Sequence, residues 1–323
     1  MNAVILRECY RMSFARKVID WQRRHGRNGL PWQATRDPYR IWLSEVMLQQ
    51  TQVATVIPYY ERFLRSYPTV EALAAATEDD VLRLWSGLGY YARGRNLHAA
   101  AKQVVAQGSF PRTAEAIEEL PGVGRSTAAA IAAFAYGERA AILDGNVKRV
   151  LARCFALGDD EKLWETATAL LPRKNIEAYT QGMMDLGATV CTREPRCDAC
   201  PVRTLCVARQ RNHIARFPAK RKKKAMRQKS ATWLVLRHNG QVLLQKRPAN
   251  GIWGGLWCFP EATGAVKGKR LAPIEHGFTH FKLRIHPVLR ELRQKTGEGL
   301  WMDVADATGA AVPAPVRRLL ARL

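Results

Sequence analysis

Residues 120–150 read LPGVGRSTAAAIAAFAYGERAAILDGNVKRV, a pattern that predicts a helix, a glycine turn, a second helix, a short loop and a third helix. Pro121, Gly122 and Gly124 form the turn, and the apolar run 128–135 has helical spacing. Because glycine tolerates positive φ and lets another backbone approach, the turn offers free N–H groups at the start of a helix. Such an arrangement binds phosphate.

A single carboxylate follows the turn, because Asp144 precedes Gly145 and Asn146 at the start of the third helix. A phosphate-binding turn followed closely by an acid favours chemistry on nucleic acid. A plainer alternative fits the same residues. Glycine turns between helices are common, and an aspartate before a helix often serves only as its N-cap.

The composition also favours a nucleic-acid partner. The chain has 323 residues, enough for about two domains, and its 51 Lys and Arg against 28 Asp and Glu give a net charge of +23. A chain this basic predicts a polyanionic partner. No apolar run reaches the roughly 20 residues of a membrane span, and residues 1–17 lack the apolar core of a signal peptide. We therefore expect a cytoplasmic protein without a membrane partner.

A second candidate acid lies on the helix predicted for residues 37–53. Glu45 follows Trp42 by three residues and Ile41 by four, which places it on or beside an apolar stripe. Burial there would raise its pKa and keep the carboxyl protonated near neutrality, as a general acid requires. The alternative is a solvent-exposed glutamate without a role.

Three separate stretches resemble one protein family. LPGVG-x-x-TA at 120–128 resembles the helix-hairpin-helix of the DNA glycosylase superfamily that includes endonuclease III. LDGNVKRV at 143–150 resembles the segment that carries the essential aspartate of that superfamily, and SEVMLQQTQV at 44–53 resembles its MutY branch. The resemblance implies an all-helical glycosylase domain over residues 1–212, with the hairpin at about 116–136.

Four of the seven cysteines fall in CTREPRCDACPVRTLC, as Cys191, Cys197, Cys200 and Cys206. Four thiolates this close indicate a metal site, and the compact spacing favours an iron–sulfur cluster over zinc, which usually has two C-x2-C pairs and a longer loop. The run resembles the 4Fe–4S loop of endonuclease III and MutY, except that the first gap has five residues where the family normally has six. We expect one 4Fe–4S cluster with a tighter first loop.

The remainder of the chain changes its period after a basic linker, residues 213–229. Residues 232–237 and 241–246 alternate like strands around Asn239-Gly240, a strong hairpin signal. Residues 230–323 resemble the smaller, Nudix-like α+β domain of MutY, although the R-E-x-x-E-E cluster of Nudix hydrolases is absent and the segment between 260 and 271 is short enough to have lost a helix. We therefore expect a domain that recognises 8-oxoguanine rather than a hydrolase.

The resemblance also implies roles for individual residues. Glu45 would donate a proton to the base, and Asp144 would stabilise the positive charge on the sugar. Tyr90 and Gln50 would enter the duplex as wedges, and Gln181 would lie at the rim of the adenine pocket. The complete set of expected DNA and base contacts is Trp32, Gln50, Tyr90, Gly122, Gly124, Ser126, Asn146, Lys148, Gln181, Phe278, Thr279 and His280.

The expected activity is that of a monomeric, monofunctional adenine DNA glycosylase acting on double-stranded DNA with adenine opposite 8-oxoguanine or guanine. Endonuclease III-like lyases have a lysine nucleophile where this chain has Ser126, so a Schiff base cannot form there; Lys148 could give weak trapping. One alternative is an endonuclease III-like glycosylase and lyase for oxidised pyrimidines. The other is a non-catalytic iron–sulfur protein that binds DNA.

Overall fold

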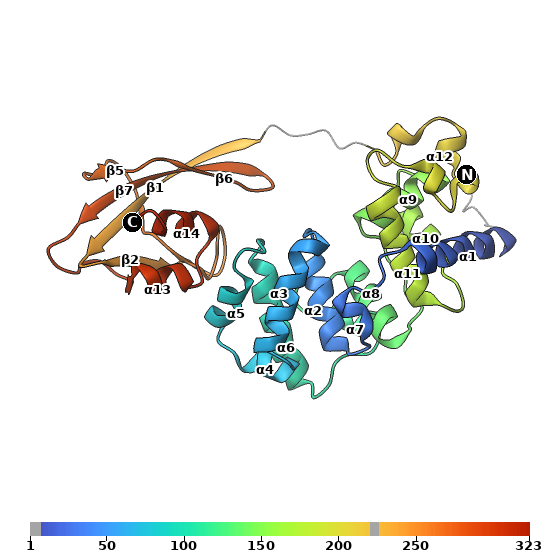
Figure 1. The fold of residues 1–323 in the computed structure, drawn as a ribbon, viewed down its shortest axis with the longest axis horizontal. Coiled ribbons are helices and arrows are strands. Elements are labelled where there is room, and N and C mark those ends of the chain that lie inside the picture. The colour runs from blue at the N-terminus through green and yellow to red at the C-terminus, as the bar shows by residue number, and fades with distance from the viewer. Residues whose placement is uncertain (1–7, 220–225) are drawn as a thin grey trace. The chain divides into compact units, whose positions relative to one another are not determined.

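The computed structural model describes residues 8–219 and 226–323. Residues 220–225, in the middle of the predicted basic linker, lie outside the described residues. The described chain is helical up to residue 216 and rich in strands from residue 227, as Figure 1 shows in the change from blue and green coils to orange arrows. This order confirms the predicted fold class, a helical domain followed by a smaller α+β domain.

The helical part begins with α1 and is built from twelve α-helices and several short 3-10 or π segments in the described residues. The α-helices are α1 Glu8–His25, α2 Pro38–Leu48, α3 Val53–Ser66, α4 Val70–Ala75, α5 Glu78–Trp85, α6 Ala92–Ala106, α7 Ala114–Glu118, α8 Arg125–Tyr136, α9 Gly145–Phe155, α10 Asp160–Ala169, α11 Ile176–Asp185 and α12 Val207–Gln210. The short segments are η1 Pro31–Ala34, η2 Leu186–Val190, η3 Cys197–Ala199, η4 Arg203–Leu205 and η5 Ile214–Arg216.

The strand-rich part forms one mixed sheet. Its elements are β1 Arg227–His238, β2 Gln241–Lys246, β3 Trp257–Cys258, β4 Glu261–Ala262, β5 Lys269–Arg270, β6 Ile274–Gly277, β7 Phe281–Glu291, β8 Leu300–Asp303, α13 Val304–Gly309 and α14 Ala314–Leu320. The long strands β1 and β7 pair in parallel, whereas β2 pairs with β1 and β6 pairs with β7 in the antiparallel direction. Figure 1 shows α13 and α14, in red, beside these strands.

Turn chemistry explains the β1–β2 hairpin. Asn239 and Gly240 both have positive φ, 46° and 77°. Two such residues match the twist of the flanking strands, which is why Asn-Gly is favoured there. The predicted hairpin is confirmed, and the described residues between 260 and 271 contain no helix, as expected from the shortened segment.

The chain divides into two compact units, and their boundaries are not simply sequential. Unit 1 contains Met1–Tyr60, Thr69–Glu71 and Ala99–Lys222, and unit 2 contains Glu61–Pro68, Ala72–His98 and Lys223–Leu323. Each unit has its own apolar core. The predicted boundaries at residues 212 and 230 therefore stay a prediction.

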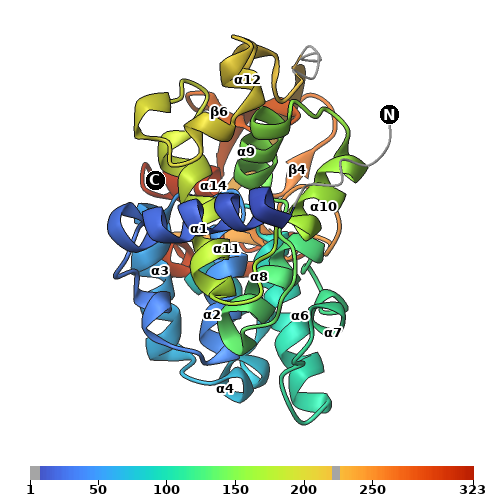
Figure 2. The ribbon, with the colours of Figure 1, turned by 90° about the vertical axis from the view of Figure 1, so that its right-hand side faces the viewer.

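The core of unit 1 is made of helices that approach closely through small residues. α8 buries a run of alanines, including Ala128, Ala132 and Ala133, and packs against α2, α7 and α11. Interaxial distance depends on the side chains at the contact, so alanine lets α2 and α8 come near. α1 packs across α11 (Figure 2). A Cβ on Gly182 of α11 would lie 2.8 Å from Val18 Cγ1 of α1, so glycine is required at that crossing.

One sequence expectation about the helices is wrong in detail. The helix predicted for residues 37–53 ends at Leu48, and α3 starts anew at Val53. The break occurs because Gln50 has φ of 56°, in the left-handed region. The start of α2 is as predicted: Asp37 is the N-cap, its carboxylate accepting from Tyr39 N, and Pro38 is the first helical residue.

Candidate active site

The glycine turn of residues 119–124 lies between α7 and α8, as the sequence predicted. Gly122 has φ of 77°, which L-amino acids rarely adopt, and Gly124 is the N-cap of α8. A Cβ on Gly124 would meet no heavy atom of the described protein within 4 Å. The space beside Gly124, at the start of α8 where a phosphate could bind, is therefore open.

The N-terminus of α9 holds the first candidate acid. Asp144 is its N-cap, and Oδ1 accepts hydrogen bonds from Asn146 N at 3.0 Å and Val147 N at 2.7 Å. Burial raises the pKa of Asp144 above its ordinary value, and the N–H donors of Val147 and Asn146 oppose that rise without cancelling it. Ser126 ties the hairpin to this acid, because its Oγ accepts from Leu143 N at 3.0 Å.

The second candidate acid is on α2, where Glu45 is only partly exposed among buried neighbours. Burial raises the pKa of Glu45 to about 7, and the nearby charge of Asp144 adds to the rise. A carboxyl with this pKa can carry a proton at neutral pH and release it in a reaction. The structure therefore brings the two predicted acids into electrostatic contact, with Glu45 the weaker acid.

Glu45 lines a pocket of about 400 Å³, within the size range of small-ligand sites. The predicted residues Trp32 and Gln181 line the same pocket. Trp32 is held edge-on against Tyr60, with ring centroids 5.4 Å apart. The other lining residues are Gln22, Asn28, Gly29, Gln33, Thr35, Arg36, Ile41, Ser44, Phe134, Glu177 and Ala178.

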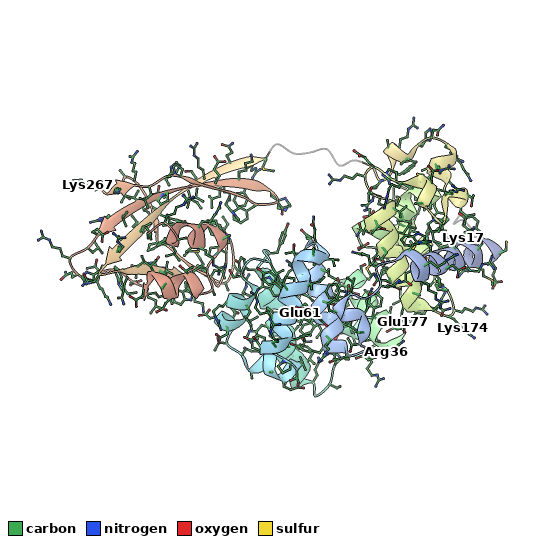
Figure 3. All side chains as sticks on the ribbon, viewed as in Figure 1. Lys17, Arg36, Glu61, Lys174, Glu177 and Lys267 are labelled. Carbon is green, nitrogen blue, oxygen red and sulfur yellow. The ribbon has the colours of Figure 1, made fainter. Side chains whose placement is uncertain are left out.

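Several lining residues were not predicted from the sequence. Arg36 and Glu177 form an ion pair of 2.7 Å between Nη1 and Oε1, and Figure 3 labels both side chains. Glu177, Gln181 and the buried Asp185 are spaced by four along α11, so they share one helix face. That spacing is the signal that sequence reasoning could have used.

Arg149 is another residue that the sequence left unassigned. Its guanidinium donates to Asn146 Oδ1 at 2.9 Å, to Gly187 O at 2.5 Å and to Cys191 O at 2.6 Å. It thereby joins the N-terminus of α9 to the π segment η2 and to the first cysteine of the loop 191–206. Lys148, on the same helix, forms an ion pair with Asp160.

All four predicted thiol ligands, Cys191, Cys197, Cys200 and Cys206, line one small pocket. Across residues 8–219 and 226–323, no three His, Cys, Asp or Glu side chains stand close enough together to hold a single metal ion. Four thiols around a shared space suit a cluster better than a mononuclear site. Arg153 supports the first of them, because its Nη1 lies 3.4 Å from Cys191 Sγ. The residues present thus fit the expected 4Fe–4S group.

Cys154 is a fifth thiol beside this loop. It is buried and lines the same pocket. Its burial in the core of unit 1 agrees with the predicted apolar role.

Unit 2 holds a second group of predicted residues. Tyr90 is exposed, with φ of 48°, and its hydroxyl lies 3.1 Å from Thr279 Oγ1. Phe278 stacks on Phe281 with ring centroids 4.4 Å apart, whereas His280 is exposed at the turn between β6 and β7. Gln50, the other expected wedge, is exposed in unit 1. Tyr90 and Thr279 are thus brought together from segments far apart in sequence.

In the part of the chain that the structure describes, no helix is both long and apolar enough to cross a bilayer.

Comparison with known proteins yields two family models. Residues 43–173 match the HhH-GPD superfamily of base excision DNA repair proteins, and residues 231–322 match the NUDIX domain. Among curated proteins, the adenine DNA glycosylase of Buchnera aphidicola subsp. Schizaphis graminum is 33% identical over 95% of this chain and 97% of its own length. The human adenine DNA glycosylase is 38% identical, covering 78% of this chain and 58% of the human protein.

The solved structures agree on the fold of the helical part. A thermostable thymine-DNA glycosylase is 30% identical with a TM-score of 0.58, covering 62% of this chain and 97% of its own. Endonuclease III in a non-covalent DNA complex has a TM-score of 0.54 at 22% identity, covering 62% of this chain and 97% of its own. The second likeness shows the fold alone.

Proposed function

Because the chain belongs to the adenine DNA glycosylase family, we propose that it removes adenine mispaired with 8-oxoguanine or guanine from double-stranded DNA. It acts as a cytoplasmic monomer and leaves an abasic site. The observation that carries the proposal is the pair of acids: Glu45, with a pKa of about 7, lines a pocket sized for a base, and the charge of Asp144 acts on it.

The target base must leave the duplex first, because its glycosidic bond is not reachable inside the stack. Tyr90 and Gln50 would fill the space left behind, and the N–H groups at the start of α8 would hold a phosphate beside Gly122 and Gly124. Asn146 and Lys148 would add contacts at α9, although the ion pair with Asp160 directs Lys148 away from a free amine role. The base would then enter the pocket lined by Trp32 and Gln181.

The chemistry divides between the two carboxyl groups. Glu45 donates its proton to a ring nitrogen of adenine, the C1′–N9 bond breaks, and its electron pair leaves with the base. Asp144, as a carboxylate, stabilises the positive charge that develops on the sugar. Water then adds to C1′ and returns one proton to Glu45. Two carboxyl groups with separated pKa values follow the logic of glycoside hydrolysis.

We propose a monofunctional enzyme, since Ser126 lies where the related lyases have their nucleophilic lysine, and its hydroxyl oxygen is engaged by Leu143 N. Cys191, Cys197, Cys200 and Cys206 would hold one 4Fe–4S cluster, which would supply structural order to the loop between them. In unit 2, Phe278, Thr279 and His280 would recognise 8-oxoguanine, with the Thr279 hydroxyl available for hydrogen bonding.

The test uses a duplex with a single adenine opposite 8-oxoguanine, and strands are analysed with and without hot alkali. Cleavage at the adenine only after alkali is expected for a monofunctional adenine glycosylase. Cleavage without alkali would instead require a lyase nucleophile, and cutting of a thymine-glycol duplex but not the adenine duplex would favour the endonuclease III-like alternative.

The assigned roles predict that Glu45→Gln and Asp144→Asn lose excision but keep duplex binding. Single-turnover excision and binding by the same preparations separate the two effects. Substantial excision by either variant would refute the role of that residue.

A further inference from the structure

Asp185 is a buried carboxylate that the proposed reaction does not use. It is fully buried at the C-terminal end of α11 and accepts three hydrogen bonds. Oδ2 accepts from Arg27 N at 2.8 Å, and Oδ1 accepts from Arg27 Nε at 2.7 Å and from Gln181 Nε2 at 2.9 Å. A charge buried with this many donors is held in a built site rather than left at random in the core.

The residues around Asp185 leave space for its carboxylate. A Cβ on Gly26 would lie 2.5 Å from Gln22 O and 3.0 Å from Asp185 Oδ2, so only glycine leaves room there. The loop after Gly26 is fixed as well, because Gln33 Nε2 donates to Arg27 O at 2.8 Å and Gln33 Oε1 accepts from Leu30 N at 3.0 Å.

The carboxylate dictates how the amide of Gln181 is turned. A carboxylate can only accept hydrogen bonds, whereas an amide has a donating NH₂ and an accepting carbonyl. The NH₂ group of Gln181 must therefore face Asp185. The described residues provide no donor to the carbonyl oxygen Oε1, and Gln181 lines the pocket. Asp185 thus takes one N–H of the Gln181 amide and leaves the carbonyl oxygen Oε1 to accept from an occupant.

We propose that Asp185 is a positioning residue that holds the Gln181 carbonyl toward the pocket and so selects a 6-aminopurine over a 6-oxopurine. This inference rests on the proposed function. The exocyclic amine of adenine donates to a carbonyl, whereas the O6 atom of hypoxanthine or guanine is an acceptor and would face another acceptor. A site built to accept from an N–H group rejects a base that lacks it, because its own polar atom is then left unpaired.

The test compares two duplexes that differ only in the target base, adenine or hypoxanthine, each opposite 8-oxoguanine. The ratio of their single-turnover excision rates is measured, and each rate is divided by the rate of acid hydrolysis of the same nucleoside to remove intrinsic reactivity. We expect the wild type to prefer adenine by at least about tenfold, and Asp185→Asn, whose amide lets Gln181 turn over, to lower that preference about tenfold.

Two further variants separate positioning from a general structural role. Arg27→Lys keeps a positive charge but loses the Nε contact to Asp185, so it should leave the base preference unchanged. In a Gln181→Leu background, Asp185→Asn should have no further effect on the preference, because Asp185 acts through Gln181. Circular dichroism checks the fold of every variant.

Each outcome of these measurements supports or overturns the inference about Asp185. A wild type that excises neither base refutes the proposed function, and this inference with it. Excision of both bases at equal corrected rates, or an unchanged preference in folded Asp185→Asn, overturns the inference while the proposed function stands. If Asp185→Asn does not fold, Gln181→Leu decides: loss of the adenine preference supports the inference, and retention overturns it.

Discussion

At the scale of single residues, the raised pKa of Glu45 links activity to stability. Burial raises the pKa to about 7 from 4.5. The raised pKa favours the protonated carboxyl in the native state, so below the unfolded pKa of 4.5 the residue does not lower the free energy of unfolding. The cost appears as pH rises from 4.5 to 7 and is complete above 7. Its full size would be about 3 kcal/mol at 1.36 kcal/mol per pKa unit.

We therefore predict that Glu45→Gln, although inactive, melts at a higher temperature than the wild type at pH 8.5. The gap in melting temperature should narrow as the pH falls from 7 toward 4.5, because the wild-type carboxyl is then protonated in both states. Thermal unfolding of both proteins across pH 4.5–8.5 measures it. Equal melting temperatures at pH 8.5 would mean that the glutamate is not desolvated.

The two acids and Gln181 differ in how much of their environment is local in the sequence. Local features of the sequence, the apolar stripe around Glu45 and the place of Asp144 before a helix, make both residues candidates, whereas the roles proposed for them come from the family resemblance. The spacing of four between Gln181 and Asp185 is visible in the sequence, but the contact that holds the Asp185 carboxylate, from the backbone of Arg27 158 residues away, is not. Hydrogen-bond partners separated this far leave no local pattern in the sequence.

At the scale of elements, a substitution in the hairpin turn should weaken DNA binding without changing the stability of the fold. A Cβ on Gly124 would meet no heavy atom within 4 Å, and its φ of −102° suits any residue. We expect Gly124→Ala to fold with nearly wild-type stability but to bind the duplex more weakly, by about tenfold, since the methyl group occupies the approach of a phosphate to the N–H groups. Duplex dissociation constants and thermal unfolding check the two halves; unchanged affinity would place the phosphate elsewhere.

For the contact between η2 and α9, in contrast to Gly124, we predict that an added methyl group lowers stability. A Cβ on Gly187 would lie 2.6 Å from Asn146 Cβ and 2.7 Å from Asn146 O, so the N-terminus of α9 would have to move. We expect Gly187→Ala to cost about 1–3 kcal/mol of stability, as overpacking does. The single-turnover rate should also fall, because Asp144 is displaced. Gly158→Ala is the matched control, since a Cβ there meets nothing within 4 Å; equal behaviour of the two variants would contradict the argument.

The end of α2 at Leu48 is a boundary that the sequence did not predict. The helix at residues 37–53 was predicted through its apolar spacing, which continues past Leu48. The backbone turns at Gln50 nevertheless, and Gln49 Nε2 reaches Gly122 O at 3.3 Å. The side chain of Gln49, just after the end of α2, thus contacts the hairpin. Local periodicity in the sequence does not report a tertiary contact of this kind.

At the scale of the whole molecule, the structure groups part of the helical sequence with the sheet. Leu82 of α5 is fully buried in the same core as Trp233 and Val235 of β1. Polar contacts follow the same division: Ser86 Oγ donates to Val312 O at 3.1 Å, and Lys246 Nζ pairs with Asp79 at 2.7 Å. The predicted boundaries at residues 212 and 230 rest on helix content, which changes only near residue 227, and composition does not report which core a helix joins.

This grouping predicts which part of the protein a core mutation loosens. Leu82→Ala should lower the stability of unit 2 by about 2–5 kcal/mol, the range for large-to-small core changes. Amide hydrogen exchange should then rise in β1 and β7, more than 140 residues away along the chain. Leu151→Ala, which truncates a leucine fully buried in the core of unit 1, is the control and should leave those strands protected. If the linker at 213–229 separated two independent folding units, Leu82→Ala would leave exchange in β1 and β7 unchanged. That result would support the sequential boundary.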